Sequence, residues 1–238
     1  MVTGGADVYT WLCVESWMRN KKSGLFCLEC PSGRGKSMNL KKLHMSSLSG
    51  VLVLILYLGL AIVSYSLYPS SFGPRGNWLS DLGNNKLNPD GAIYYRLAGI
   101  LGGLVLGFFF VGLKDWYKGQ KGKPKIFMSI AQLFGVLTSF AFIMTGYFSE
   151  DKLIPHSFWS IANYILFGTA VFFVGFALLY YRNVPKSFSV FCFVLALIDI
   201  TSGVYGKTYW LEWLVVFMLL TFVASVSYLT NRHLEQGH

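Results

Sequence analysis

Long apolar runs separated by short polar segments make up most of the chain after about residue 45. Each run has about 20 residues, and at a rise of about 1.5 Å per residue a helix of that length crosses the roughly 30 Å hydrocarbon layer of a bilayer. None of the runs shows the strict alternation of a barrel strand. The pattern therefore predicts six membrane-spanning helices, at residues 49–68, 92–113, 126–148, 158–181, 187–205 and 209–230.

Basic residues are divided unevenly between the two sides of these six spans. Of the 20 Lys and Arg residues, 15 fall in the N-terminal tail, the second and fourth loops and the C-terminal tail; the other side holds Arg75, Lys86, Arg96, Lys152 and Lys207. Cytoplasmic loops are enriched in Lys and Arg. We therefore expect an all-α, polytopic six-helix bundle in the cell membrane, with both termini in the cytoplasm.

Composition supports the same class of protein. Hydrophobic residues make up 54% of the chain and charged residues only 13%, whereas soluble domains are about a quarter charged. In a soluble protein, the net charge of +9 would indicate nucleic-acid binding. Here topology accounts for the basic residues, so we expect membrane lipids rather than nucleic acid as partners.

Three segments follow from this pattern: a cytoplasmic tail at 1–44, the six-helix domain at 45–231 and a short cytoplasmic tail at 232–238. The first tail lacks the apolar core of a cleavable signal peptide. It is either a flexible extension or the product of a start upstream of a native Met38. Cys27 and Cys30 form a CxxC pair, but too few further ligands accompany them for a closed zinc site.

The second span carries a stripe of glycines at Gly99, Gly103 and Gly107. Small residues four apart let a neighbouring helix approach closely. The stripe therefore predicts either tight packing inside the bundle, which we favour, or a seam between two copies of the chain.

Ionisable and amide side chains gather in the outer loops and in the outer halves of the helices. Such groups are costly at membrane depth and usually face an interior or a water-filled cavity. We therefore expect one outward-facing pocket, in which Arg96 pairs with the deeply placed Asp199. The residues expected around it are Asp81, Arg96, His156, Asn163, Asp199 and Glu212.

The first outer loop, residues 76–91, predicts a short helical turn over the mouth of this pocket. Trp78, Leu79 and Leu82 would form its apolar side, and Gly83 would end it in a left-handed conformation. Ser80 and Asp81 would then lie near the mouth, although Asp81 alternatively serves only to cap the turn.

A family resemblance rests on the stretch Asn77 to Gly83 (NWLSDLG), Asn88-Pro89, the glycine-rich second helix, His156 and Glu212. Over about residues 46–230 these features resemble the prokaryotic six-span membrane family catalogued as domain of unknown function 998. The Ser-Asp pair is also similar to the FRAG/DRAM membrane group. The resemblance implies that Ser80, Asp81, His156 and Glu212 share one outer-face site, but it brings no activity with it.

The sequence thus predicts a membrane protein that binds lipid, or acts as a scaffold among lipids, through a polar outer pocket. The first alternative is a hydrolase or transferase acting on lipid headgroups, with Ser80 as nucleophile and His156 with Asp81 or Glu212 as acid–base groups. The second alternative is a transporter or channel, although the sequence shows no inverted repeat. The sequence leaves the cofactor unknown. A zinc site of three histidines is excluded in a monomer, because three of the four His residues fall on the cytoplasmic side, whereas a site of His156, Asp81 and Glu212 stays open.

Overall fold

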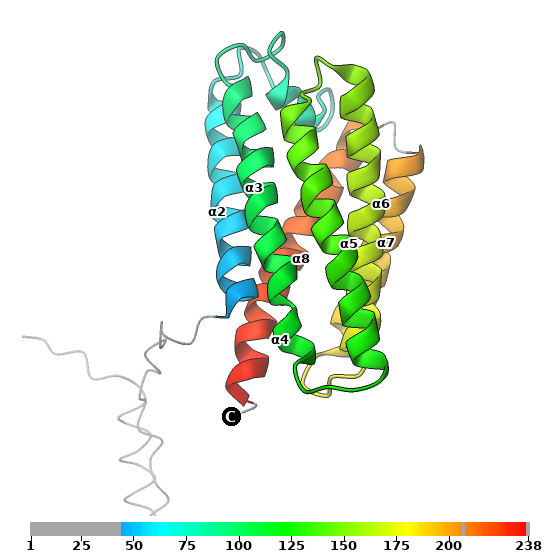
Figure 1. Cartoon of the computed structure of the whole chain (residues 1–238). Helices are drawn as coiled ribbons and strands as arrows, with labels where there is room; N and C mark the ends of the chain where they lie inside the picture. Colours follow the sequence, from blue (N-terminus) through cyan, green and yellow to red (C-terminus); the bar gives the residue numbers. More distant parts are fainter. Residues whose placement is uncertain (1–43, 206–207, 237–238) are drawn as a thin grey trace, which may run out of the picture. The chain divides into compact units, whose positions relative to one another are not determined.

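The computed structural model describes residues 44–205 and 208–236. Six long helices run up and down the bundle (Figure 1), and the described residues contain no strand. This confirms the predicted all-α six-helix class. The long helices are α2 (Met45–Ser66), α3 (Ala92–Gly112), α5 (Lys123–Tyr147), α6 (Leu153–Leu178), α7 (Lys186–Tyr205) and α8 (Tyr209–Gln236); the two short ones are η2 (Leu79–Gly83) and α4 (Lys114–Tyr117).

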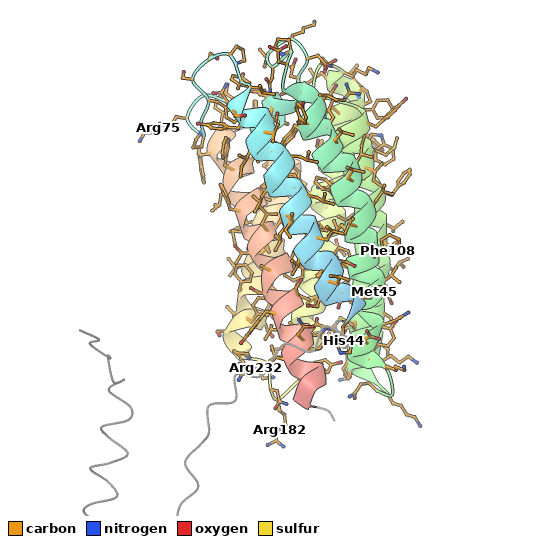
Figure 2. The ribbon with its side chains drawn as sticks, turned by 90° about the vertical axis from the view of Figure 1, so that its left-hand side faces the viewer. His44, Met45, Arg75, Phe108, Arg182 and Arg232 are labelled. Carbon is orange, nitrogen blue, oxygen red and sulfur yellow. The ribbon has the colours of Figure 1, made fainter. Side chains whose placement is uncertain are left out.

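Helices that follow one another in the sequence pack side by side, from α2 through α3, α5 and α6 to α7. The last helix, α8, closes the bundle against α2 and α7. All six long helices are long and apolar enough to cross a membrane, and large apolar side chains such as Ile55, Phe108 and Leu197 are exposed. Figure 2 shows Phe108 on the outside of the bundle. The chain is a multi-pass membrane protein.

Some helices extend beyond the apolar runs from which the spans were predicted, so their ends differ from the predicted ones. Helix α6 begins at Leu153 rather than at residue 158, because Pro155 fits the first turn of a helix, where its missing N–H costs nothing. Helix α8 continues to Gln236, through most of the predicted C-terminal tail. The fifth predicted span, residues 187–205, is confirmed as α7, although it contains the carboxyl group of Asp199.

The two ends of the bundle carry the charged residues. Arg75 lies at the end that carries η2, called here the η2 end, whereas His44, Arg182 and Arg232 lie at the opposite end, which carries α4 (Figure 2). Both limits of the described chain are at this α4 end (Figure 1). That the α4 end faces the cytoplasm stays a prediction from the distribution of basic residues.

The glycine stripe of α3 lies against α5 inside the bundle. A Cβ atom at Gly99 would be 3.0 Å from the Cα of Gly146, and one at Gly103 would be 3.0 Å from the carbonyl oxygen of Ser139. The two backbones therefore approach so closely that larger residues would push them apart. Packing within the bundle, the interpretation favoured from the sequence, accounts for these contacts; an oligomer through this face stays a prediction.

Large side chains fill the core at the α4 end. Phe109, Phe110, Leu113 and Trp116 have at most 1% of their surface exposed. The Trp116 indole Nε1–H donates a hydrogen bond of 2.8 Å to the hydroxyl of Thr230 on α8. This end of the bundle is thus filled by aromatic rings.

Candidate functional site

The loop between α2 and α3 folds back over the η2 end and is anchored by one buried amide. The Asn88 side-chain NH2 donates to the carbonyl oxygens of Ser64 and Leu82, at 3.1 and 3.0 Å, and to the Ser64 hydroxyl. Asn88 is fully buried, so these bonds replace water for the carbonyl groups they satisfy. From the sequence, Asn88-Pro89 contributed to the family resemblance, and nothing pointed to this anchoring role.

The predicted helical turn is present as the 3₁₀ helix η2, and Leu79 and Leu82 are buried on its apolar side. The prediction for Gly83 is wrong, because the glycines with a positive backbone φ angle among the described residues are Gly119 and Gly122. A Cβ at Gly83 would lie 3.1 Å from the ring of Tyr95. A glycine is needed there for close approach to α3 rather than for a left-handed conformation.

Below η2 lies a cavity of about 120 Å³ between the helices. Its wall is polar at the η2 end, where Ser80, Glu150 and His156 lie, and apolar deeper in the bundle. The deep lining residues include Leu106 on α3, Phe167 on α6 and Val223 on α8. Each of these three lies 14 residues into its helix, or about 20 Å at 1.5 Å per residue.

Glu212, in the first turn of α8, holds η2 in place. Its Oε2 accepts a 2.6 Å hydrogen bond from the Leu79 amide, and Ser80 hydrogen-bonds the same carboxyl group. The next residue, Trp213, donates from Nε1 to the Asn77 carbonyl oxygen at 3.1 Å. Two of the residues predicted for the site, Ser80 and Glu212, are therefore brought into contact at the cavity wall.

Asp81 is buried and caps η2, because its Oδ2 accepts a 3.0 Å hydrogen bond from the Trp78 amide. This contact matches the alternative interpretation of Asp81 as a capping residue, and Asp81 is not among the residues lining the cavity. Its carboxyl group does hydrogen-bond Glu150, which lines the polar end of the cavity next to η2, called here the mouth. Burial, and then the neighbouring Asp81, raise the pKa of Glu150 to about 8.

His156 lies at the cavity wall near the start of α6, and its hydrogen bonds define its tautomer. Nδ1 is 2.7 Å from the carbonyl oxygen of Phe148, which can only accept, so Nδ1 carries the hydrogen. In the neutral ring Nε2 is then an acceptor, and it lies 3.3 Å from the Ser160 hydroxyl. Ser160, one helical turn from His156, was missed from the sequence, although the spacing of four residues was the available signal.

The predicted pair of Arg96 and Asp199 is wrong. Arg96 lines the cavity and donates, at 3.4 Å, to the carbonyl oxygens of Gly146 and Tyr147 at the end of α5. Asp199 is fully buried on α7, lies outside the cavity lining, and has no hydrogen-bond partner within the described chain. Depth in the membrane can be estimated from sequence, but the direction in which each helix face points cannot.

Between the polar mouth and the apolar floor lies a group of amide and phenol side chains. Asn163 lines the cavity, and its Oδ1 is buried with no partner among the described residues. The hydroxyl groups of Tyr57 and Tyr95 are 3.0 Å apart, and Tyr164 also lines the wall. The tyrosines were not anticipated, because aromatic residues in apolar spans usually serve as packing.

No group of three or more His, Cys, Asp or Glu side chains within residues 44–205 and 208–236 is placed to hold a metal ion. Cys27 and Cys30 lie outside the described residues. Comparisons with protein-family models, with curated proteins and with solved structures found no match. The resemblance to the six-span family therefore stays a prediction from the motifs themselves.

Proposed function

We propose that the chain binds a single-chain amphiphilic lipid in this cavity, with the polar head at the η2 end and the hydrocarbon chain toward Leu106, Phe167 and Val223. The change from polar to apolar lining along the cavity is the observation that supports the proposal. Ligand cavities are mostly apolar, with a few polar groups that fix orientation, and this arrangement would orient a molecule that has one end of each kind.

The cavity lining changes from polar to apolar in the same direction as a bilayer leaflet does, from its headgroups to its hydrocarbon chains. The mouth of the cavity is at the helix ends, and its floor is about 20 Å deeper in the helices, which exceeds half of the roughly 30 Å hydrocarbon layer. A lipid moving from the leaflet into the bundle would keep its orientation and its depth. The head would therefore stay near water while the chain exchanges lipid contacts for protein contacts.

The mouth favours a head that donates hydrogen bonds, such as one carrying hydroxyl or ammonium groups. Glu150 and Glu212 present carboxyl oxygens there. Arg96 is the cavity's one lysine or arginine within the described chain, and its guanidinium already contacts two backbone carbonyls. A phosphate or sulfate head mainly accepts hydrogen bonds, and among the described residues Arg96 is the one cationic side chain in the lining that could donate to it.

No comparable observation supports a transporter or channel, in which a solute would pass through the bundle. The cavity lies toward the η2 end, and beyond it Phe109, Phe110, Leu113 and Trp116 fill the core with at most 1% of their surface exposed. A transporter or channel needs a polar path that reaches both faces. Binding from one side is the function that agrees with a cavity that is apolar at its floor.

The proposal can be tested with a fluorescent monoacylglycerol titrated into the purified full chain in nanodiscs. We expect saturable binding by the wild-type protein. Replacing Val216, which lines the cavity, with Phe should reduce the affinity at least tenfold by occupying the space of the hydrocarbon chain. The matched control is Val190→Phe, because Val190 is 58% exposed on α7.

Melting temperatures of both variants show that the fold is intact. The absence of saturable binding to the wild type would refute the proposal, as would equal binding by the wild type and a folded Val216→Phe variant. A phosphate-headed single-chain lipid, lysophosphatidic acid, tests the preference for a donating head and should bind more weakly than the monoacylglycerol.

A further inference from the structure

We propose that Ser160 and His156 form a nucleophile–base pair that cleaves a fatty-acyl ester bound in the cavity. This inference rests on the proposed binding of a single-chain amphiphile and adds a reaction to it. Both residues line the cavity, and Ser160 replaces Ser80 as the candidate nucleophile, because Ser80 hydrogen-bonds Glu212 rather than a histidine.

The Ser160 hydroxyl has a different hydrogen-bond partner from eight other serine and threonine hydroxyls of the long helices. Serine and threonine side chains within helices commonly bond to the carbonyl oxygen one turn earlier. That bond, between 2.6 and 2.9 Å long, is made here by Ser49, Thr138, Ser139, Thr169, Ser202, Thr221, Ser227 and Thr230. Ser160 instead contacts the imidazole Nε2 of His156, so its proton is directed at a base.

The histidine is held in the tautomer that a base requires. Its Nδ1–H bond to the Phe148 carbonyl oxygen, at 2.7 Å, fixes the ring and leaves the Nε2 lone pair toward Ser160. A nucleophile, a base and a third group that orients the base form the usual unit of covalent catalysis. The 3.3 Å separation of Ser160 and His156 is typical of such pairs before substrate binds, when these bonds are often long.

Ser160 lies where the carbonyl group of a bound acyl ester would be. It is seven residues into α6, or about 10 Å from the helix start at 1.5 Å per residue. His156 is one turn closer to the mouth, and the apolar Phe167 is about two turns deeper. In a single-chain ester the carbonyl joins the polar head to the hydrocarbon chain, so it would be placed at this boundary.

Asn163 is placed to stabilise the negative charge that develops on the carbonyl oxygen. It lies three residues beyond Ser160, on the same side of the helix, and it lines the same cavity. Its Oδ1 has no hydrogen-bond partner in the described residues, so no bond to that oxygen holds the amide group in one orientation. An amide NH2 aimed at a developing oxyanion typically contributes about 10²–10³ in rate.

The reaction needs only water as co-reactant. The Ser160 Oγ forms a bond to the acyl carbon, its proton passes to His156 Nε2, and the carbonyl electron pair moves to the oxygen. When the tetrahedral intermediate collapses, the bond from the acyl carbon to the alcohol oxygen breaks, and that oxygen takes the proton from His156. Water then attacks the acyl-serine with His156 again as base, which releases a fatty acid and restores Ser160.

The test uses the full chain in nanodiscs and a long-chain alkyl fluorophosphonate, which forms a covalent bond with a base-activated serine. We expect an adduct that peptide mass spectrometry locates at Ser160. Ser160→Ala should abolish labelling, and His156→Gln should slow it at least 100-fold, as loss of a general base commonly does. The control Ser157→Ala, a neighbouring serine outside the cavity lining, should be labelled like the wild type.

A second measurement follows fatty acid released from monooleoylglycerol, which Ser160→Ala should prevent. The fluorescent monoacylglycerol titration, repeated on Ser160→Ala, separates this inference from the proposed function. If the wild type binds the lipid but Ser160 forms no adduct, or if labelling is unchanged in folded His156→Gln, the catalytic pair is refuted and binding stands. If the wild type shows no saturable binding, the proposed function itself fails.

Discussion

At the α4 end of the bundle, aromatic side chains fill the space between the helices, whereas at the η2 end the same helices enclose a cavity. Trp116 has 1% of its surface exposed and hydrogen-bonds α8, and the Tyr181 hydroxyl donates to the Trp116 carbonyl oxygen at 2.5 Å. The η2 end instead exposes Glu150, His156 and Asn163 to a common space. In this fold, the closely packed core at the α4 end can therefore contribute the stability that the cavity at the η2 end does not.

The largest expected effect is at the α4 end. Trp116→Ala removes a fully buried ring, opens a cavity in the core and breaks the hydrogen bond to Thr230. We therefore expect the free energy of unfolding to fall by about 3–5 kcal/mol. Chemical denaturation in detergent micelles, followed by circular dichroism, measures this change. Trp210→Ala is the matched control at the other end; because Trp210 is 57% exposed, its effect should stay near 0.5 kcal/mol. Equal losses from the two variants would contradict the comparison.

A smaller effect of opposite sign is expected from Asp199→Leu. Both oxygens of this fully buried carboxyl group lack a hydrogen-bond partner in the described residues, and an unsatisfied buried polar group costs about 1–3 kcal/mol. An apolar residue of similar size should therefore raise the stability by about that amount. The same denaturation experiment detects it.

Adding Arg96→Leu to Asp199→Leu tests whether the two residues interact. Because Arg96 contacts backbone carbonyls instead, the two changes in stability should add within about 0.5 kcal/mol. A coupling well above that value would restore the pair expected from the sequence. A loss of stability from Asp199→Leu alone would show that this carboxyl group has a partner.

The smallest expected effect is a change in the pH dependence of stability through Glu150. Its pKa rises from about 4.5 to about 8 in the folded chain, so the folded state binds a proton more tightly than the unfolded state. The stability that this group contributes is fully present below pH 4.5 and is lost as pH rises through 8. Glu150→Gln should therefore flatten the curve of melting temperature against pH within this window.

Asp151→Asn provides the control for Glu150→Gln. Although burial acts in the opposite direction, hydrogen bonds from Ser149 and Asn85 hold the pKa of Asp151 below its usual value. Its contribution is therefore lost as pH falls through that lowered pKa, so the control variant should leave the slope at neutral pH unchanged. An unchanged slope in Glu150→Gln would contradict the buried, proton-sharing contact with Asp81.

The sequence was sufficient to predict the six helices, because an apolar run of about 20 residues has few structural alternatives in a membrane. It also placed Ser80, His156 and Glu212 near one end, since position along a span gives depth. It could not give the direction of each helix face, and so Arg96 was paired with Asp199. The contact of His156 with Ser160 was missed for another reason, because a spacing of four residues on one helix occurs too often to indicate a site by itself. Gly83 shows the same limit, because a glycine in a turn indicates either a special φ angle or a close approach.

The way α8 closes the bundle has a consequence for biogenesis. Helices α3, α5, α6 and α7 each pack on the long helix made just before them, so they can assemble in order as they leave the ribosome. Helix α8 must return to α2, the first long helix, and it brings Glu212, Val216 and Val223 to the cavity wall. Until that helix has been synthesised and inserted, the cavity lacks one wall and η2 lacks its carboxylate partner. A nascent chain therefore has no complete pocket, and the ligand meets a finished site only after the last transmembrane segment is in place.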